Sequence, residues 1–438
     1  MLFMNRRGFL IRSGVASAGL VTWVPLASAA QASKVDAAPS QNPAVTAVEV
    51  LEKLWAAIRD HYPMLEFVGV HDDAWLDEFR PRVAAAKDLA AAFPIMEELV
   101  CRLRDYHTRL WWPGKPDRAS LPVLGHLLPG REPSLVVVRR SAVEGVGPGD
   151  EIVRVGGLPV QEALAAAWRY AVGSTPEAQS RSAVDRMLSA APGAEVALEL
   201  RERAGAALRE VRLHASGYPD DEPTVSDRAL DKDTGYIRIP RWYGKEGEDL
   251  PALFDTALER YRLHSHLVID VRGNGGGSDA LADAVTGRFI RNKIISSISF
   301  HREAPSLQFR RTVEWCEPRG PWTYEGRVAV LIDEGCASAC EHFVSGMIGA
   351  GACLAGMPTN GACGWIGRIG LPGGAVLFCS RTFPLHGGTP SPLHGLEPHF
   401  REPLTQAALR ARKDVVLERA QKWLGSGEPL PVRHQPVL

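Results

Sequence analysis

Apolar residues set the first visible pattern of this 438-residue chain. From Val45 they recur every three or four positions, a spacing that predicts amphipathic helices. We expect further helices at Trp75–Ala86 and from near Pro94, since proline suits a first helical turn. The run Arg109–Trp112 then predicts a short strand. Together these elements predict an N-terminal helical lobe over residues 44–118.

Residues 120–216 show a different pattern, in which short β-like runs are separated by glycine turns. The expected elements are strands at Leu135–Arg139, Glu151–Val155, Glu195–Arg201 and Val211–Leu213, with one helix at Val160–Tyr170. The order V-G-P-G-D-E-I-V-R-V-G-G-L-P-V resembles the PDZ fold, which captures an extended peptide along a strand edge. A small β domain with glycine turns is the alternative interpretation.

Residues 225–438 alternate strands with helices, which predicts an α/β domain with a mixed, largely parallel sheet. The expected elements are strands at Thr234–Ile239 and His266–Val271, helices at Leu250–Tyr261, after Ser278 and at Leu404–Leu424, and a strand-loop-helix unit at Val328–Ile348. Ligands bind at the carboxyl ends of parallel strands. We therefore expect the loops Gly273–Gly277 and Gly335–Ser338 to line a site.

Ser338 stands where the apolar strand from Val328 turns into a helix. A serine on such a turn can present its hydroxyl to a substrate, and the helix N-terminus favours developing negative charge. Ser338 and Glu341 also fit the S-x-x-E capping box, so a serine that only caps its helix is the alternative.

The three consecutive glycines in Gly273–Gly277 allow backbone N–H groups to approach a ligand closely. The loop lacks the Lys and Ser/Thr of a phosphate-binding P-loop. Beside a serine, it suits an oxyanion hole, in which N–H donors stabilise the negative oxygen of a tetrahedral intermediate. Glycines that only shape a sheet edge are the alternative.

The net charge and the first thirty residues limit which partners and which cellular location we expect for this protein. The formal net charge is −1, so we expect no nucleic-acid partner. Arg6 and Arg7 precede an apolar stretch at Val15–Leu26 and small residues at Ala27–Ala30. This order predicts a twin-arginine-type signal peptide over residues 1–31, a periplasmic or otherwise exported location, and no membrane span after its removal.

The seven cysteines give no metal-site spacing, because a lone C-x-x-x-C pair is unlike a zinc motif. We expect neither a metal nor a cofactor. An exported compartment permits disulfides, and the odd number of cysteines leaves at least one thiol free.

Two motifs together resemble those of the tail-specific or C-terminal-processing serine proteases. They are D-V-R-G-N-G-G-G at Asp270–Gly277 and C-A-S-A-C-E at Cys336–Glu341. G-Y-I-R-I at Gly235–Ile239 and G-L-E-P at Gly395–Pro398 match the same family, as does the layout of a helical lobe and a PDZ-like insert. The resemblance implies a protease core with crotonase-like βαβ units over residues 225–438, and Ser338 as its nucleophile.

The resemblance also implies an oxyanion hole. Its donors are the N–H of Ala339 and that of a glycine in Gly275–Gly277, which we place at Gly276 with Gly275 beside it.

The base departs from the processing-protease pattern, in which a lysine follows the serine in a G-x-P-T-x-G-K segment. Here Gly356–Gly361 is followed by Ala362, and no lysine occurs between Lys293 and Lys413. The tricorn-core branch instead uses a histidine from the N-terminal lobe, in a segment read L-x-D-G-H-T. L-R-D-Y-H-T at Leu103–Thr108 resembles that segment, with tyrosine in place of glycine. His107 therefore becomes the expected base, since histidine titrates near neutral pH.

The sequence leaves undecided which residue orients the expected base. The tricorn branch places a glutamate shortly before its G-V-x-P-D segment, but Thr389–His394 holds no carboxylate. Ser391, His394 and Glu397 are the orienting candidates.

The sequence as a whole predicts an exported serine-type endopeptidase or carboxyl-terminal peptidase. Its expected partner is a polypeptide substrate or C-terminal peptide, and a homo-oligomer is possible. One alternative is an inactive pseudoprotease that binds peptides through the PDZ-like domain. Another is a binder of small hydrophobic ligands, as in the related retinoid-binding repeats.

Overall fold

The computed structural model describes residues 45–70, 72–128, 134–140, 143–202, 205–217, 221–303, 308–362, 364–386, 389–390 and 394–432. The expected signal peptide, Cys363 and Ser391 lie outside these ranges. Across the described ranges, no helix is long and apolar enough to cross a membrane.

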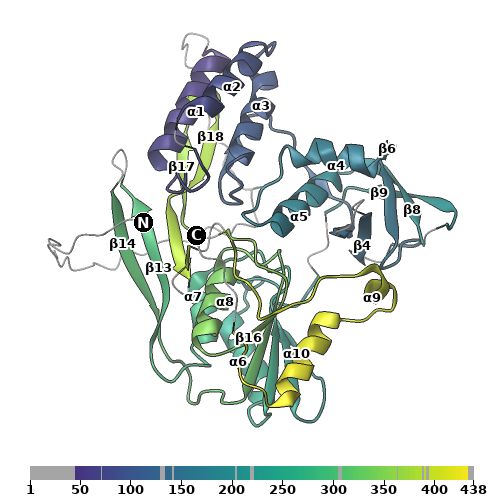
Figure 1. Ribbon diagram of the computed structural model, residues 1–438, viewed down its shortest axis with the longest axis vertical. Coiled ribbons are helices and arrows are strands. Elements are labelled where there is room, and N and C mark those ends of the chain that lie inside the picture. The colour runs from purple at the N-terminus through teal and green to yellow at the C-terminus, as the bar shows by residue number, and fades with distance from the viewer. Residues whose placement is uncertain are drawn as a thin grey trace. The chain divides into compact units, whose positions relative to one another are not determined.

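Three helices form the N-terminal lobe (Figure 1): α1 (Ala47–His61), α2 (Ala74–Ala84) and α3 (Leu89–Cys101). Helix α3 begins earlier than the sequence predicted, because the carboxylate of Asp88 caps it by accepting from the N–H of Ala91. Pro94 lies inside the helix instead of starting it. The apolar core of the lobe also contains residues from the C-terminal half, among them Leu377 and Phe383.

A separate apolar cluster lies within residues 119–215. The strands of this inserted domain are β2 (Ala119–Ser120), β3 (Val123–Leu128), β4 (Ser134–Arg140), β5 (Glu151–Val155), β6 (Leu158–Pro159), β7 (Ser189–Ala190), β8 (Glu195–Arg201) and β9 (Leu208–His214). They form a sheet of order β3-β4-β5-β8-β9, with β6 paired to β5, and a separate β2–β7 pair. The helices are α4 (Val160–Trp168) and α5 (Pro176–Met187). The sequence prediction missed α5, although Thr175 caps it and Pro176 opens it.

The core contains one sheet of order β10-β11-β12-β15-β16-β21. Its strands are β10 (Ser226–Ala229), β11 (Thr234–Arg238), β12 (His266–Asp270), β15 (Arg327–Ile332), β16 (Cys353–Gly356) and β21 (Phe400–Arg401). Only β10 runs antiparallel to its neighbour, so the expected largely parallel sheet is confirmed.

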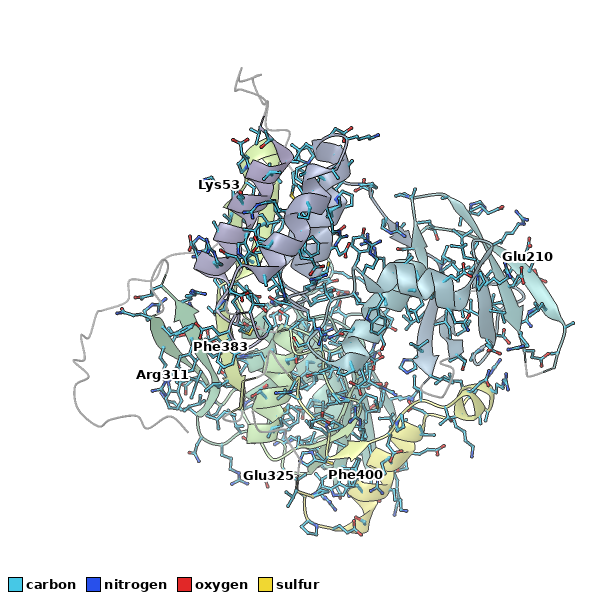
Figure 2. The ribbon with its side chains drawn as sticks, turned by 45° about the horizontal axis from the view of Figure 1, so that its top comes forward. Lys53, Glu210, Arg311, Glu325, Phe383 and Phe400 are labelled. Atoms are coloured by element: carbon cyan, nitrogen blue, oxygen red, sulfur yellow. The ribbon has the colours of Figure 1, made fainter. Side chains whose placement is uncertain are left out.

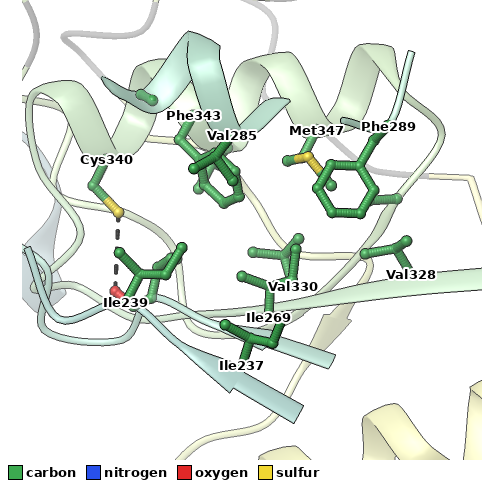
Figure 3. Packing of buried hydrophobic residues seen from close by; sticks show 14 of the residues in the cluster. Ile237, Ile239, Ile269, Val285, Phe289, Val328, Val330, Cys340, Phe343 and Met347 are labelled. Atoms are coloured by element: carbon green, nitrogen blue, oxygen red, sulfur yellow. Dashed lines mark hydrogen bonds between the residues drawn. The ribbon is translucent and has the colours of Figure 1, made fainter. Parts of the chain in front are cut away.

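Helices cover both faces of this sheet. On one face lie α6 (Leu250–Arg260), α7 (Asp279–Thr286) and α8 (Ala339–Gly349), and on the other lies α10 (Val415–Ser426). Side chains alternate accordingly: Ile269 and Val330 meet α8, where Phe343 and Met347 pack over them (Figure 3), whereas Val268 faces α10. Strands buried on both faces explain the continuous apolar runs in the sequence.

Two further sheets surround the core. One has the order β14-β13-β19-β20 and the other β1-β18-β17. Their strands are β13 (Ile294–Arg302), β14 (Phe309–Cys316), β19 (Thr382–His386), β20 (Thr389–Pro390), β1 (Arg109–Trp111), β18 (Val376–Ser380) and β17 (Ile366–Gly370). The pairing of β1 with β18 joins the N-terminal lobe to the C-terminal half.

The expected single tail helix at Leu404–Leu424 is two helices, α9 (Gln406–Arg410) and α10. Arg412 interrupts it with a positive φ of 54°, and Asp414 caps α10 by accepting from the N–H of Leu417.

Candidate active site

Ser338 lies between β15 and α8 with φ 58° and ψ −125°, a conformation that L-residues rarely adopt. Such a conformation costs about 1–3 kcal/mol and persists only where the surroundings enforce it. The hydroxyl makes no capping hydrogen bond. The alternative in which Ser338 only caps its helix is therefore not supported, and the partly exposed Ser338 lies at the helix N-terminus with its hydroxyl free of that role.

Glu341 explains why the box does not form. Its fully buried carboxylate accepts from the hydroxyl of Thr359 at 2.5 Å and from the N–H of Gly361 at 2.9 Å. The N–H of Ser338 in turn donates to the carbonyl of Ala362 at 2.7 Å. These bonds attach the segment after β16 to the first turn of α8, so residues far apart in the sequence enforce the serine conformation.

The glycine loop after β12 lies directly against the serine. A Cβ at Gly276 would be 2.7 Å from Ser338 Cβ and 3.1 Å from the nitrogen of Ala339, and the φ of Gly276 is 105°. Only glycine allows this approach. The N–H of Gly276 donates to Asn274 Oδ1 at 2.9 Å, whereas the N–H of Ala339 has no acceptor among the described residues.

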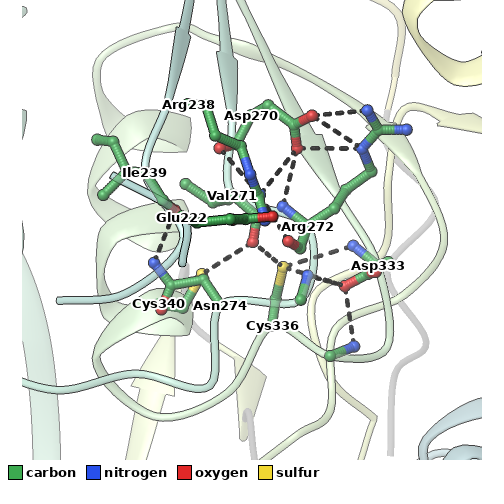
Figure 4. A network of polar contacts seen from close by, with 12 residues as sticks. Glu222, Arg238, Ile239, Asp270, Val271, Arg272, Asn274, Asp333, Cys336 and Cys340 are labelled. Carbon is green, nitrogen blue, oxygen red and sulfur yellow. Dashed lines mark hydrogen bonds and ion pairs between the residues drawn. The ribbon is translucent and has the colours of Figure 1, made fainter. Parts of the chain in front are cut away.

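Charged side chains hold the loop in place (Figure 4). Arg272 pairs with Asp270 at 2.6 Å and with Asp414 of α10 at 2.7 Å. Burial alone raises the pKa of Asp270, but Arg272 and Arg238 bring that pKa below its ordinary value. The D-V-R-G motif thus stabilises the turn and does not itself face the serine hydroxyl.

Asp333, at the start of the serine turn, joins the two loops. Its Oδ1 accepts from the N–H of Gly273 at 2.7 Å and from that of Gly335 at 2.9 Å. Arg181 of α5 lies 3.7 Å from Asp333 and packs over Gly335, where a Cβ would be 2.6 Å from its guanidinium. The inserted domain therefore contacts the turn that carries Ser338.

His107 is 4% exposed, in the turn between α3 and β1. Asp105 anchors this turn by accepting from the N–H of His107 at 3.0 Å, from the Thr108 hydroxyl at 2.5 Å and from the Ser380 hydroxyl at 2.6 Å. Burial lowers the pKa of His107, and the charge of Asp105 offsets only part of that shift. The imidazole is therefore neutral near pH 7, which is the state that a general base needs.

The turn that carries His107 and the turn that carries Ser338 contact neighbouring residues of the segment after β16. The imidazole of His107 hydrogen-bonds to the backbone of Gly364, and Ser338 bonds to Ala362. The Nδ1 atom of His107 is buried and has no partner among the described residues. Among the described residues, therefore, no carboxylate bonds to Nδ1 to orient the ring.

Two of the orienting candidates, His394 and Glu397, follow in the chain close to a residue that contacts this segment. Gly395 packs against the carbonyl of Thr359, and the N–H of Leu396 donates to the Thr359 hydroxyl at 2.6 Å. This contact brings His394 and Glu397 to the segment that Glu341 anchors. Nε2 of His394 is buried without a partner among the described residues.

Sequence reasoning missed a second titratable group beside the serine. His342 lies one turn after Ser338 on α8, and its Nε2 is 2.9 Å from Asp283 Oδ1. Burial alone lowers the pKa of His342, but the hydrogen bond to Asp283 and the charges of Asp279 and Glu314 raise it overall. Asp279 also acts electrostatically on His107. The i, i+4 spacing of serine and histidine was the available signal.

The six described cysteines are buried free thiols: Cys101, Cys316, Cys336, Cys340, Cys353 and Cys379. Cys336 and Cys340 both direct their sulfur atoms at the carbonyl of Val271. Burial raises the pKa of the Cys336 thiol well above its ordinary value, which keeps it protonated. Within the described ranges, no group of three metal-ligating side chains could hold an ion.

Residues 233–400 match the model of peptidase family S41. Among solved structures, the chain is similar to mature CPAF, with 15% identity over 88% of this chain and 99% of that chain and a TM-score of 0.68. It is also similar to the photosystem II D1 C-terminal processing protease, with 18% identity over 85% of this chain and 99% of that one and a TM-score of 0.51. At these identities the likeness concerns the fold.

The α/β core and the family match together define a hydrolase of the serine peptidase class. The family match covers residues 233–400, which lie within the α/β core.

Proposed function

We propose that the chain is an exported peptidase of the His-dependent, tricorn-like kind, cleaving polypeptides through an acyl-enzyme on Ser338. The observation that carries this proposal is the convergence of two turns on one segment. Ser338, strained and free of a capping bond, contacts Ala362, and the buried His107 contacts Gly364.

In this mechanism His107 takes the proton of the Ser338 hydroxyl as the oxygen attacks the scissile carbonyl. The resulting oxyanion accepts from the N–H of Ala339, which has no acceptor among the described residues. A second donor comes from the Gly275–Gly276 stretch, where Asn274 holds the N–H of Gly276 until the loop adjusts to substrate. His107 then protonates the leaving amine, and water releases the acyl group.

The inserted domain serves, in this proposal, as a PDZ-like module that presents polypeptide chains to the site. Its edge strand β3 lies beside α5, the arrangement in which an added peptide strand gains backbone hydrogen bonds. Arg181 of α5 reaches the serine turn, so the module is in direct contact with the catalytic loops.

Labelling with a fluorophosphonate probe tests the nucleophile. We expect the wild-type chain to be labelled and Ser338→Ala to be unlabelled, with Cys336→Ala as a matched control in the same turn that keeps its labelling. His107→Ala should slow labelling by at least about a hundredfold, the contribution of a positioned base. A wild-type chain that resists the probe, or a serine variant that still reacts, would refute the mechanism.

An inactive peptide-binding pseudoprotease is the second candidate. Two observations favour it: Asn274 already occupies the N–H of Gly276, and Nδ1 of His107 has no partner among the described residues. In that case the probe would leave the wild-type chain unmodified while peptides still bind with measurable affinity.

A further inference from the structure

Strand β14 lies at an open edge of its sheet. It is the end strand of the order β14-β13-β19-β20, and its only strand partner among the described residues is β13. Figure 1 shows β14 on the outer side of the β13–β14 hairpin, and Figure 2, which labels Arg311 of β14, shows the hairpin at the same periphery in a second view. The eight residues Phe309–Cys316 therefore leave a row of backbone N–H and C=O groups for another strand to pair with.

This edge has few of the features that keep edge strands from pairing. Such strands are commonly short, interrupted by proline or bulged. Strand β14 contains no proline, and the one irregularity in its pairing with β13 places the extra residue, Ser296, on β13. Two large rings of β14 are also exposed, Phe309 by 41% and Trp315 by 47%. A long edge with exposed aromatic rings is typical of a strand that pairs with another chain.

The side chains of β14 alternate between the two faces of the sheet. One face carries three alternate residues: Arg310, Thr312 and Glu314. The opposite face carries the four residues between and beside them: Phe309, Arg311, Val313 and Trp315. Directly opposed residues of neighbouring antiparallel strands point to the same face. Two copies of β14 related by a twofold axis can therefore pair only if each residue meets one of its own set.

Pairing two copies of β14 antiparallel about Thr312 meets this condition with complementary side chains. Thr312 then lies opposite its own copy, Arg310 lies opposite Glu314, and Phe309 lies opposite Trp315. Because the interface is symmetric, the charged pair and the aromatic pair each occur twice. Opposite charges and aromatic rings are among the side-chain pairs that stabilise neighbouring strands.

The other symmetric registers are less favourable. Centring the pair on Arg310, Arg311 or Glu314 sets two like charges directly opposite each other, which destabilises neighbouring strands. Centring it on Val313 places Arg310 opposite the buried Cys316. The register about Thr312 is therefore the one that the charges of β14 select.

Both members of the charged pair are accessible to a second chain. The side chain of Arg310 is 55% exposed, and its described ion pair is a 3.5 Å contact with Glu303, which is equally exposed at 53%. Glu314 is exposed as well. An ion pair between exposed groups is weak, so it leaves Arg310 able to turn toward the carboxylate of a neighbouring strand.

We propose that this protein forms a homodimer in which two β14 strands pair antiparallel about Thr312 and join the two four-stranded sheets into one continuous sheet. The occupant of the open edge is thus a second copy of this chain. The proposal concerns assembly and does not depend on the catalysis proposed for Ser338.

Sedimentation velocity on the full chain, over a dilution series into the micromolar range, tests the dimer. We expect the wild-type chain to sediment with twice the mass of one chain. Arg310→Glu sets glutamates opposite each other at both charged pairs and should weaken dimerisation at least about tenfold. Arg291→Glu is the matched control, because Arg291 is 70% exposed and lies outside β14, and this charge reversal should leave the dimer unchanged.

Mixing two variants tests the register itself. Glu314→Arg should weaken self-association as Arg310→Glu does, since it sets arginines opposite each other. A chain with Arg310→Glu and a chain with Glu314→Arg regain two opposite-charge pairs when they meet each other, so their mixture should recover the wild-type affinity. Circular dichroism would check that each variant keeps the wild-type fold.

A wild-type chain that stays monomeric over the whole series would overturn the proposal. A dimer that both single variants leave intact would overturn it as well, because the interface then lies elsewhere. A mixture of the two variants that fails to dimerise would rule out antiparallel pairing about Thr312.

Discussion

At the scale of single residues, the proposed chemistry depends on how Asp105 and His107 share one buried turn. Asp105 is 3% exposed and receives three donors, so its negative charge is compensated without contact to the imidazole ring. That charge still raises the proton affinity of His107, against the larger effect of burial. Asp105 thus both positions the His107 backbone and tunes its ring.

Asp105→Asn should move the acidic limb of the kcat/KM profile to lower pH. Removing the negative charge lowers the pKa of His107 further, and activity requires the neutral ring, so the variant stays deprotonated at more acidic pH. Thr108→Val removes one donor but keeps the charge and should leave the limb in place. A limb that moves upward, or that moves equally in both variants, would contradict this role.

Because the wild-type pKa of His107 is already lowered, folding stability should also fall as pH drops below about 6.5. In that range the unfolded chain binds a proton at His107 and the folded chain does not.

At the scale of elements, the proposed active site depends on the attachment of helix α8 to the segment after β16. Glu341 accepts from Thr359 and Gly361, and Ser338 donates to Ala362. A single buried carboxylate thus fixes both the helix start and the loop that approaches His107. The strained φ of Ser338 is maintained by this attachment, since the serine itself forms no cap.

Glu341→Gln should reduce the free energy of unfolding by roughly 1–3 kcal/mol, because the amide oxygen can still accept from both donors but the bonds lose the help of the negative charge, and an NH2 group replaces the second buried oxygen. The acylation rate should fall by at least about tenfold as Ser338 relaxes. Chemical denaturation and probe labelling measure the two effects. Ser345→Ala, on the same helix and partly exposed, is the control and should change neither. Full activity in a destabilised Glu341 variant would separate the attachment from catalysis.

At the scale of the whole molecule, three parts of the chain meet at the serine turn. The N-terminal lobe brings His107, the core brings Ser338 and the glycine loop, and the inserted domain brings Arg181. Arg181 lies near both Asp333 and Glu334, and Glu334 also contacts His126 of β3 at 3.4 Å. The side chains next to the β3–α5 edge are therefore in electrostatic contact with the turn preceding Ser338, the proposed nucleophile.

Arg181→Met should lower kcat/KM by at least about tenfold while the inserted domain keeps its own fold. The methionine fills the same space over Gly335 but leaves Asp333 without its cation, so the two catalytic loops lose a shared anchor. Arg201→Met, which breaks the Glu151 pair inside the inserted domain, is the matched control and should keep activity. Circular dichroism and kinetics would be compared for both variants. Equal losses in both would point to general destabilisation of the domain.

Several features could be read from the sequence because they depend on local backbone demands. The glycine loop sits in a short motif whose positive-φ backbone favours glycine, the serine turn sits in a second short motif, and continuous apolar runs marked the buried parallel strands. Other features were not predicted from the sequence. Strand β13 (IISSISFHR) carries serines among its apolar residues and β14 (FRRTVEWC) carries adjacent arginines, so this hairpin showed no clear periodicity; α5 was missed despite its Thr175–Pro176 start.

The sequence by itself determined the class of the core, the place of Ser338 on a strand-to-helix turn and the lack of any lysine between Lys293 and Lys413, because these follow from motifs a few residues long and from composition. Only the tertiary structure decided which donors the carboxylate of Glu341 accepts from and which carbonyl accepts from the N–H of Ser338. Each is a contact between separate segments of the chain. Packing determines which donor bonds to which acceptor at such contacts. The S-x-x-E pattern is an example: by local preference the carboxylate of Glu341 would cap its own helix, but in the folded chain it accepts from Thr359 and Gly361.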